Sequence, residues 1–378
     1  MAVNAGSKKI LQAKVKTFNR RQFLQTSLAC GLAWPYLSAS AANDNSFILP
    51  AEYAKHHSTW MAHGVNVRFW PEKFLPAIRK NLVLIAQTIA KYEPVSLLVR
   101  PKEFERAQDL YAGTVSYIKR PLDNLWIRDA APCLLLNAEG KLRAIDLHFK
   151  AWDKPADYRR DHKLAEFMAK QLQAEYLEAN FELDHSTLEV DGAGTAILTE
   201  SSVYYQGRNK HLAKVQIESR LKRLMGIKKV IWLPGNPTGH LAERRTDYYV
   251  RFVQAGKVLV SHEPNPTFKE HALTLRHQEL LKQATDAKGN RLELVVLNKP
   301  KGVRVEFIGA NFSSSYLGFY VCNKAVLLQE FGDALTDNAA RRALQAAYPE
   351  RKIELLNIDA LASGGASIHS VTRQQPSL

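Results

Sequence analysis

The sequence has 378 residues, of which 46% are hydrophobic and 24% are charged, and its formal net charge is +15. This length suits one large domain or two ordinary ones, and the hydrophobic content excludes an intrinsically disordered chain. Lys and Arg are scattered between hydrophobic runs, so the positive charge gives little support for nucleic-acid binding. We therefore expect a globular protein with no nucleic-acid partner.

The first 41 residues have the features of an export signal. An arginine pair at 20–21 precedes a modestly apolar stretch at 28–37, and Ala39-Ser40-Ala41 forms a small-residue cleavage pattern. Together these features predict a twin-arginine signal peptide over residues 1–41 and a periplasmic or secreted mature protein. The alternative is a cytosolic N-terminal helix, which Trp34-Pro35 would interrupt.

Cleavage would leave a net charge of +9, because the removed segment contains six Lys and Arg residues and no Asp or Glu. We expect this mature chain to have no membrane contact. Its cysteines, Cys133 and Cys322, each lie in an apolar run, which favours burial, and pairing in an oxidising compartment is the alternative. The Cys and His spacings resemble no metal site, so we expect neither a metal nor a cofactor.

A helix over 74–89 and a strand over 95–99 begin the mature chain, and a unit of hairpin, helix and strand then recurs. The expected hairpins pair 133–137 with 142–147, 187–190 with 195–199, 248–253 with 257–262, and 316–321 with 325–330. The expected helices are 161–172, 212–224, 268–284 and 337–348, and the expected strands are 229–233, 292–297 and 352–358. Irregular links are expected at 101–120, 148–160 and 298–314.

The two ends of the chain supply a fifth unit. The initial helix and strand lack a hairpin, and an unpartnered strand is expected at 367–372. If that strand pairs with the strand around 58–62, the ring closes with five units and leaves no open end. The sequence therefore predicts a single α/β domain over 46–378 with a pocket on the ring axis.

Several motifs, in the same order over nearly all of the mature chain, resemble those of one enzyme family. They are Ala51-Glu52-Tyr53, Thr59-Trp60-Met61-Ala62, Trp126-Ile127-Arg128-Asp129-Ala130-Ala131-Pro132, Val190-Asp191-Gly192-Ala193-Gly194-Thr195, Val230-Ile231-Trp232-Leu233-Pro234-Gly235, Phe331-Gly332-Asp333, Tyr348-Pro349-Glu350-Arg351 and the stretch 364–376. With them the chain resembles the agmatine deiminases and the bacterial (Porphyromonas-type) peptidylarginine deiminases. The resemblance implies the pentein fold, a five-bladed α/β-propeller.

The resemblance also implies a reaction, the hydrolysis of a guanidinium C–N bond. For agmatine this reaction yields N-carbamoylputrescine and ammonia, a step of putrescine biosynthesis. In the family a cysteine thiolate attacks the guanidinium carbon, carboxylates hold the cation, and a histidine acts as acid and base. A planar cation with five donors suits carboxylates, and so weak an electrophile requires an ionised nucleophile.

The motifs assign site residues position by position. The two carboxylates of the family fall on Asp129 and Asp247, but its nucleophilic cysteine falls on Ser370 and its acid/base histidine on Arg245. The resemblance further assigns substrate-binding positions to Trp126, Asp129, Asp184, Asp247, Gly364 and Gly365. Two further departures are Asp184-His185-Ser186, where the family has E-G-G, and Gly318, where it has Asn.

These departures weaken the case for catalysis. A serine hydroxyl needs a base in hydrogen-bond contact, and Arg245 cannot accept a proton. His369 is next to Ser370, but successive side chains of a strand point to opposite faces, so we do not expect contact. His240, five residues before Arg245, could replace the missing histidine only if the loop were shifted.

Two hypotheses follow. In the first, the protein is a non-catalytic exported relative in which Arg244 or Arg245 pairs with Asp129 or Asp247, so that the pocket binds agmatine poorly and takes an anionic or neutral ligand instead. A solvated surface pair is the alternative role for the two arginines. In the second, the protein is an active hydrolase of guanidino compounds that uses Ser370 and His240. The sequence leaves the choice between monomer and homodimer open.

Overall fold

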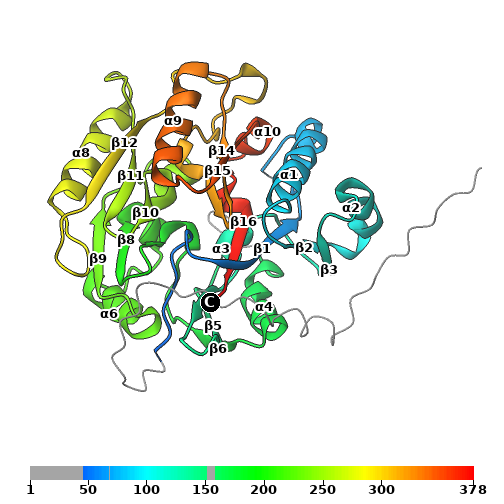
Figure 1. Cartoon of the computed structure of the whole chain (residues 1–378), viewed down its shortest axis with the longest axis horizontal. Helices are drawn as coiled ribbons and strands as arrows, with labels where there is room; N and C mark the ends of the chain where they lie inside the picture. Colours follow the sequence, from blue (N-terminus) through cyan, green and yellow to red (C-terminus); the bar gives the residue numbers. More distant parts are fainter. Residues whose placement is uncertain (1–45, 68, 151–157) are drawn as a thin grey trace, which may run out of the picture. The chain divides into compact units, whose positions relative to one another are not determined.

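The computed structural model describes residues 46–67, 69–150 and 158–378, and Asn45–Leu378 forms one compact unit (Figure 1). The predicted signal peptide and part of the link at 148–160 lie outside the described residues. The described strands form five sheets, which matches the five units expected from the sequence.

One sheet has four strands and the other four have three. The four-stranded sheet contains, in order, β16 (Thr372–Pro376), β1 (His56–His63), β2 (Val95–Val99) and β3 (Ser116–Lys119). The next two sheets contain β4 (Cys133–Leu136), β5 (Leu142–Asp146) and β6 (Glu175–Glu178), and then β7 (Glu189–Val190), β8 (Thr195–Thr199) and β9 (Lys229–Leu233). The last two contain β10 (Val250–Gln254), β11 (Lys257–His262) and β12 (Glu293–Asn298), and then β13 (Tyr320–Cys322), β14 (Ala325–Gln329) and β15 (Lys352–Leu356).

In every sheet an antiparallel pair is followed by a parallel crossover through a helix. The crossover helices are α1 (Leu75–Ile89), α4 (Leu164–Leu172), α6 (Lys214–Met225), α8 (Lys269–Gln283) and α9 (Ala334–Ala347). Shorter helices are α2 (Phe104–Tyr111), α3 (Ile127–Ala130), α5 (Glu200–Val203), α7 (Leu241–Arg244) and α10 (Asp359–Ala362). The apolar spacing in α1 buries Ile78, Leu82, Ile85 and Ile89 on one face, as the sequence predicted.

The C-terminal strand β16 closes the first sheet. It pairs antiparallel with β1, with Trp60 opposite Arg373, so the expected pairing of the two chain ends is confirmed. The expected bounds 367–372 are wrong, because the strand begins only at Thr372. Gly365 has a φ of +85°, and hydrogen bonds between Ser367 and Ser370 close a turn before the strand.

Three other expectations need correction. The link at 101–120 is not irregular, because it contains α2 and β3 and so gives the first sheet its fourth strand. Strand β6 was not predicted, because it is a sheet-edge strand of only four residues with a Glu at each end. The hairpin strand expected at 316–321 begins instead with a 3-10 turn, in which Ser315 accepts a hydrogen bond from the backbone of Leu317.

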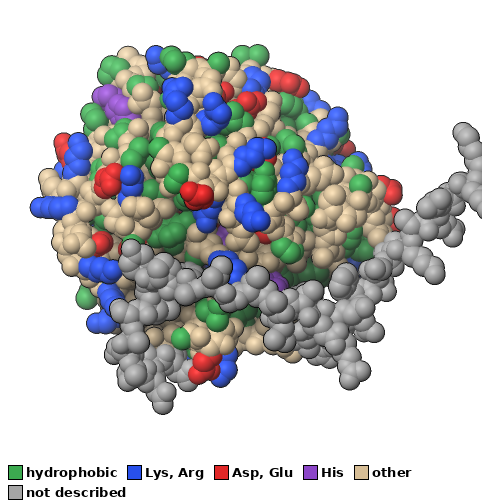
Figure 2. Space-filling model, viewed as in Figure 1, with side chains coloured by type: hydrophobic (Ala, Val, Ile, Leu, Met, Phe, Trp, Pro, Cys, Tyr) green, Lys and Arg blue, Asp and Glu red, His purple; other side chains and the backbone are tan. Residues whose placement is uncertain are grey.

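Cys133 and Cys322 are buried and carry free thiols, so the interpretation of burial is confirmed. In the part of the chain that the structure describes, no helix is both long and apolar enough to cross a membrane. Lys and Arg are interspersed with Asp and Glu over the face shown in Figure 2.

Candidate active site

Five short helical turns meet at the centre of the fold. They are α3, η5 (His185–Thr187), η7 (Thr246–Tyr248), η9 (Tyr316–Gly318) and η10 (His369–Val371). Each turn directly precedes the first strand of one sheet, so each repeat contributes the same segment. The turn α3 contacts η5 and η10, and η7 contacts η5 and η9. Most of the predicted site residues lie on or beside these turns.

Arg245 lies between the two predicted carboxylates. Its side chain is only 2% exposed, with Nη1 3.4 Å from Oδ2 of Asp129 and Nε 3.7 Å from Oδ1 of Asp247. Nη2 donates a hydrogen bond of 3.3 Å to the carbonyl of Gly365. The guanidinium carbon is 5.9 Å from the centre of the Trp126 ring. These five predicted residues are therefore brought together, and the guanidinium among them belongs to the protein itself.

The contacts of Arg245 are long for charged groups, since such pairs usually approach to about 2.7–2.9 Å. Burial raises the pKa of Asp129 to about 6, although Arg245 lowers it and Asp184 raises it further. At Asp247 burial also disfavours the charge, but Arg245 and the hydrogen bond with His369 hold the pKa below its ordinary value. Asp129 is consequently the carboxyl that takes up a proton first.

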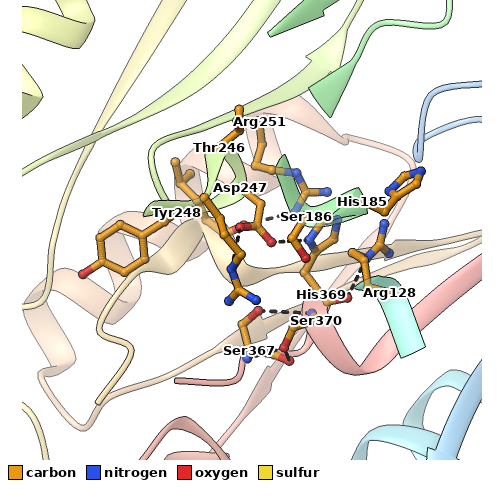
Figure 3. A network of polar contacts seen from close by, with 12 residues as sticks. Arg128, His185, Ser186, Thr246, Asp247, Tyr248, Arg251, Ser367, His369 and Ser370 are labelled. Atoms are coloured by element: carbon orange, nitrogen blue, oxygen red, sulfur yellow. Dashed lines mark hydrogen bonds and ion pairs between the residues drawn. The ribbon is translucent and has the colours of Figure 1, made fainter. Parts of the chain in front are cut away.

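The hydroxyl of Ser370 is used within its own turn (Figure 3). Ser370 is completely buried, and its Oγ donates to the carbonyl of Ser367 at 2.9 Å and accepts from the backbone N–H of Ser367 at 2.8 Å. The backbone N–H of Ser370 donates in turn to Oγ of Ser367 at 3.2 Å. A carbonyl oxygen cannot act as a general base, so these contacts stabilise the turn without activating the hydroxyl.

His369 has a carboxylate at each ring nitrogen. Nδ1 lies 2.7 Å from Oδ2 of Asp247, and Nε2 lies 2.9 Å from Oε2 of Glu52. Burial, followed by the charges of Arg128 and Arg251, lowers the pKa of His369, while the two carboxylates oppose that shift. Because both nitrogens are engaged, the imidazole cannot serve as the base of its sequence neighbour.

Glu52 is a central residue to which the sequence assigned no role. Its carboxylate accepts from Nη2 of Arg128 at 2.8 Å, from Nη2 of Arg251 at 2.7 Å and from the backbone N–H of Val321 at 3.0 Å. Burial disfavours its charge, but Arg251, His369 and Arg128 together hold the pKa of Glu52 well below its ordinary value. The only signal in the sequence was its place in a motif, since it precedes the first strand.

Arg251 and Arg128, the two arginines that contact Glu52, make further buried contacts. Nε of Arg251 lies 3.0 Å from Oε2 of Glu189, and its Nη1 donates to the carbonyls of Leu317 and Phe319. Burial raises the pKa of Glu189 to about 7 in spite of Arg251. Arg128 donates from Nε to the carbonyl of His369 at 2.6 Å. These bonds tie the turns of different sheets to one another.

The segment 184–186 reaches the same centre. Ser186 donates to Oδ1 of Asp129 from its backbone N–H at 3.2 Å and from Oγ at 2.5 Å. Asp184 accepts from Nη1 of Arg208 at 2.8 Å through Oδ2, while its Oδ1 has no hydrogen-bond partner among the described residues. Asp184 therefore lies close enough to Asp129 to raise its pKa, but its nearest partner is an arginine of this chain.

His240 and Arg244 do not join the carboxylates. Nε2 of His240 lies 3.0 Å from Oε1 of Glu243, and its Nδ1 has no hydrogen-bond partner among the described residues. The guanidinium carbon of Arg244 lies 3.7 Å from the centre of the Tyr205 ring. Of the two arginines, Arg245 is thus the one that faces Asp129 and Asp247.

Two glycines permit close packing around the turn of Ser370. A Cβ at Gly318, the position that the sequence resemblance aligns with Asn, would lie 2.5 Å from Cβ of Ser367. A Cβ at Gly364 would lie 2.3 Å from Nε1 of Trp70. The side chain of Ser367 therefore occupies the space that a residue at 318 would need.

Comparison with known proteins identifies the relatives of this fold. Residues 48–376 match the Porphyromonas-type peptidyl-arginine deiminase family. The chain belongs to this family. A putative agmatine deiminase of Streptomyces coelicolor is 31% identical over 338 residues, covering 88% of this chain and 99% of the relative. One of Selenomonas ruminantium is 31% identical over 366 residues, covering 90% and 98%.

Solved deiminase structures have the same fold. The agmatine deiminase of Enterococcus faecalis superimposes with a TM-score of 0.80 at 23% identity, covering 88% of this chain and 96% of that structure. A putative agmatine deiminase also has a TM-score of 0.80, at 28% identity and with the same coverage. These neighbours confirm the predicted α/β pentein fold of this deiminase-family chain.

Among the described residues of this family member, no group of three or more His, Cys, Asp or Glu side chains is arranged to hold a metal ion. The roles assigned to Ser370, Arg245, Asp129 and Asp247 stay predictions, and the geometry above bears on how they would act.

Proposed function

We propose that this protein is an exported, catalytically silent member of the deiminase family, in which Arg245 occupies the place of a substrate guanidinium. The observation that carries this proposal is the position of Arg245 between Asp129 and Asp247. The expected nucleophile position is a serine whose hydroxyl is held by Ser367. Serine at position 370 lacks the reactive thiol, and Arg245 fills the place of the substrate guanidinium.

The Ser370 hydroxyl has no base among the described residues that could activate it as a nucleophile. A serine near neutral pH keeps its proton unless a base accepts it. Both ring nitrogens of His369 face carboxylates, and His240 pairs with Glu243. The proton of Ser370 is donated to a carbonyl, which does not raise its nucleophilicity. We therefore expect no attack on a guanidinium carbon.

Arg245 is the residue that would keep a substrate guanidinium out of the site. A cysteine-to-serine variant of the agmatine deiminase of C. jejuni, a structural neighbour with a TM-score of 0.77, was solved with substrate bound. Serine in place of a cysteine is thus compatible with substrate binding in that protein. In this chain we expect agmatine to bind poorly because the guanidinium of Arg245 already neutralises the carboxylates. A neutral or anionic small molecule is then the better ligand.

Product analysis tests the proposal. The purified protein is incubated with agmatine, free arginine and arginyl peptides, and ammonia and ureido product are measured. We expect no turnover above the buffer. Turnover that disappears in Ser370→Ala would refute the proposal and support the alternative hydrolase that uses Ser370 and His240.

Restoring the family residues tests where the defect lies. We expect the double variant Ser370→Cys with Arg245→His to convert agmatine measurably. Ser370→Cys alone keeps the internal guanidinium and should stay inactive. The matched control, Ser370→Cys with Arg244→His, makes the same replacements but places the histidine beside Tyr205, so it should also stay inactive.

Export is the second part of the proposal, and it rests on the arginine pair and cleavage pattern of residues 1–41. Cell fractionation of the wild type and of the variant Arg20→Lys with Arg21→Lys tests it. The wild type should appear in the periplasm or medium in a shortened form. The variant should remain in the cytoplasm at full length, and equal distribution of the two would contradict export.

A further inference from the structure

Each carboxylate at the centre presents only one oxygen to Arg245. Asp129 approaches the guanidinium with Oδ2, 3.4 Å from Nη1, and Asp247 approaches it with Oδ1, 3.7 Å from Nε. The other oxygen of Asp247 lies 2.7 Å from Nδ1 of His369. The other oxygen of Asp129 is engaged by Ser186. Arg245 therefore meets two carboxylates through one oxygen each.

Ser186 occupies both acceptor positions on Oδ1 of Asp129. Its backbone N–H donates to this oxygen at 3.2 Å, and its Oγ–H donates at 2.5 Å. A carboxylate oxygen accepts about two hydrogen bonds, so Oδ1 has no position left for a guanidinium. Guanidinium and carboxylate groups pair most strongly through two parallel bonds, one to each oxygen. The competition of Ser186 explains why Arg245 makes a single, long hydrogen bond to Asp129.

The backbone around Ser186 holds the side chain against Asp129. Ser186 lies in η5, where the N–H of Thr187 donates to the carbonyl of Asp184 at 2.9 Å. The carbonyl of Thr187 accepts from Oγ1 of Thr246 at 2.6 Å. Ser186 is only 1% exposed, so bulk water does not compete for its hydroxyl. These contacts do not involve the arginine of the centre, and they would persist without it.

We propose that Ser186 is a specificity-determining residue of this site. By engaging Oδ1 of Asp129, it makes the carboxylate pair unsuited to a guanidinium and leaves the pair suited to a primary ammonium. A guanidinium is planar and its fork of donors matches paired oxygens, whereas an ammonium is a compact charge whose donors rotate freely. The proposal rests on the proposed function, because it takes the place of Arg245 as the binding position. Replacing Arg245 alone would then not restore a full guanidinium site.

The guanidinium of the protein itself provides the first test. In a crystal structure of Ser186→Ala, Arg245 should contact both oxygens of Asp129 at about 2.7–2.9 Å, because one acceptor position on Oδ1 becomes free. Ser202→Ala is the matched control, since it removes a buried hydroxyl that contacts Thr187. The control should keep the single contact of 3.4 Å. The same single contact in Ser186→Ala would overturn the proposal.

Two small ligands test the preference directly. Calorimetry compares butylguanidine with butylamine, which differ only in the head group, on Arg245→Ala and on Arg245→Ala with Ser186→Ala. Loss of the Ser186 hydroxyl should tighten butylguanidine binding about tenfold, the effect of one hydrogen bond to a charged group, and should change butylamine binding less than about threefold. Ser186→Gly removes the same hydroxyl and replaces the alanine variant if that variant does not fold.

Two outcomes distinguish the role of Ser186 from the proposed function. If neither ligand binds to the Arg245→Ala variants but Arg245 contacts both Asp129 oxygens in Ser186→Ala, Arg245 does not stand in a guanidinium site and the competition of Ser186 for Oδ1 is supported. If butylguanidine binds to Arg245→Ala and its affinity relative to butylamine is the same with and without the Ser186 hydroxyl, the place of Arg245 is supported and Ser186 does not set the preference.

Discussion

Replacing Arg245 by alanine is the sharpest test of its place in the centre. The change leaves Asp129 and Asp247 buried and without the guanidinium that neutralises them. Removal of one partner of a buried ion pair typically costs about 3–5 kcal/mol. We expect the lower end, because the contacts of 3.4 and 3.7 Å are long and Asp129, with a pKa of about 6, protonates readily.

Agmatine should recover part of this loss. If Arg245 stands where a substrate guanidinium would bind, the alanine variant has room for one between the same carboxylates. At about 100 times its Kd, agmatine would restore about 2.7 kcal/mol. Urea unfolding at pH 7 measures both effects and avoids guanidinium salts, which would compete for the site. The wild type should show no comparable stabilisation by agmatine.

Arg244→Ala is the matched control, because it removes the same side chain from the neighbouring residue that packs on Tyr205. It should lose less stability and should not respond to agmatine. The loss of stability in Arg245→Ala should also shrink as the pH falls to 5, because the unpaired buried carboxylates then take up protons. If agmatine stabilises both arginine variants equally, or neither, Arg245 does not occupy a guanidinium site.

Three further substitutions test other parts of the centre. Glu52→Ala should cost about 3–5 kcal/mol in urea unfolding, because it leaves the buried Arg128 and Arg251 without their shared carboxylate; a cost below about 1 kcal/mol would contradict this role. Gly318→Asn should destabilise the fold by about 1–3 kcal/mol through contact with Ser367, and Ser367→Gly in the same chain should relieve most of that loss; additive costs would contradict the steric explanation. Asp129 has a pKa of about 6 in the folded protein, above its unfolded value, so the carboxyl binds more protons when the protein is folded. Its contribution to the free energy of unfolding therefore falls as the pH rises from about 4 through 6. Asp129→Asn should remove this pH dependence of stability, and an unchanged pH dependence would show that another group titrates there.

The sequence could predict the repeat because each unit has its own local pattern. Helical spacing in α1 and the strand hairpins place the elements, and the motif order led from the repeat to Asp129, Asp247 and Arg245. The elements around the first sheet were harder to predict. In α2 the buried residues are the i, i+4 pair Ala107 and Tyr111, and one such pair in a helix of eight residues is a weak signal.

Apart from the pairing of β1 with β16 and the contacts of Arg245 with Asp129 and Asp247, contacts between distant segments could not be predicted. The stretch around Ile368 was expected to be a strand because of its β-branched residues, yet the hydrogen bonds between Ser367 and Ser370 form a turn. Glu52 is joined to Arg128 and Arg251, which lie 76 and 199 positions away along the chain. No local pattern encodes such pairs, because a charge in isolation is usually found at the surface.

The pairing of β16 with β1 has a consequence for how the chain is made. His56 lies opposite Pro376, so the first sheet needs residues from both ends of the compact unit. During synthesis β1 emerges early, and one of its edges stays unpaired until β16 has been translated. Unpaired edges recruit other chains, and contacts so distant form slowly. Nascent chains in which β16 has not yet been made should therefore be the form most prone to aggregate.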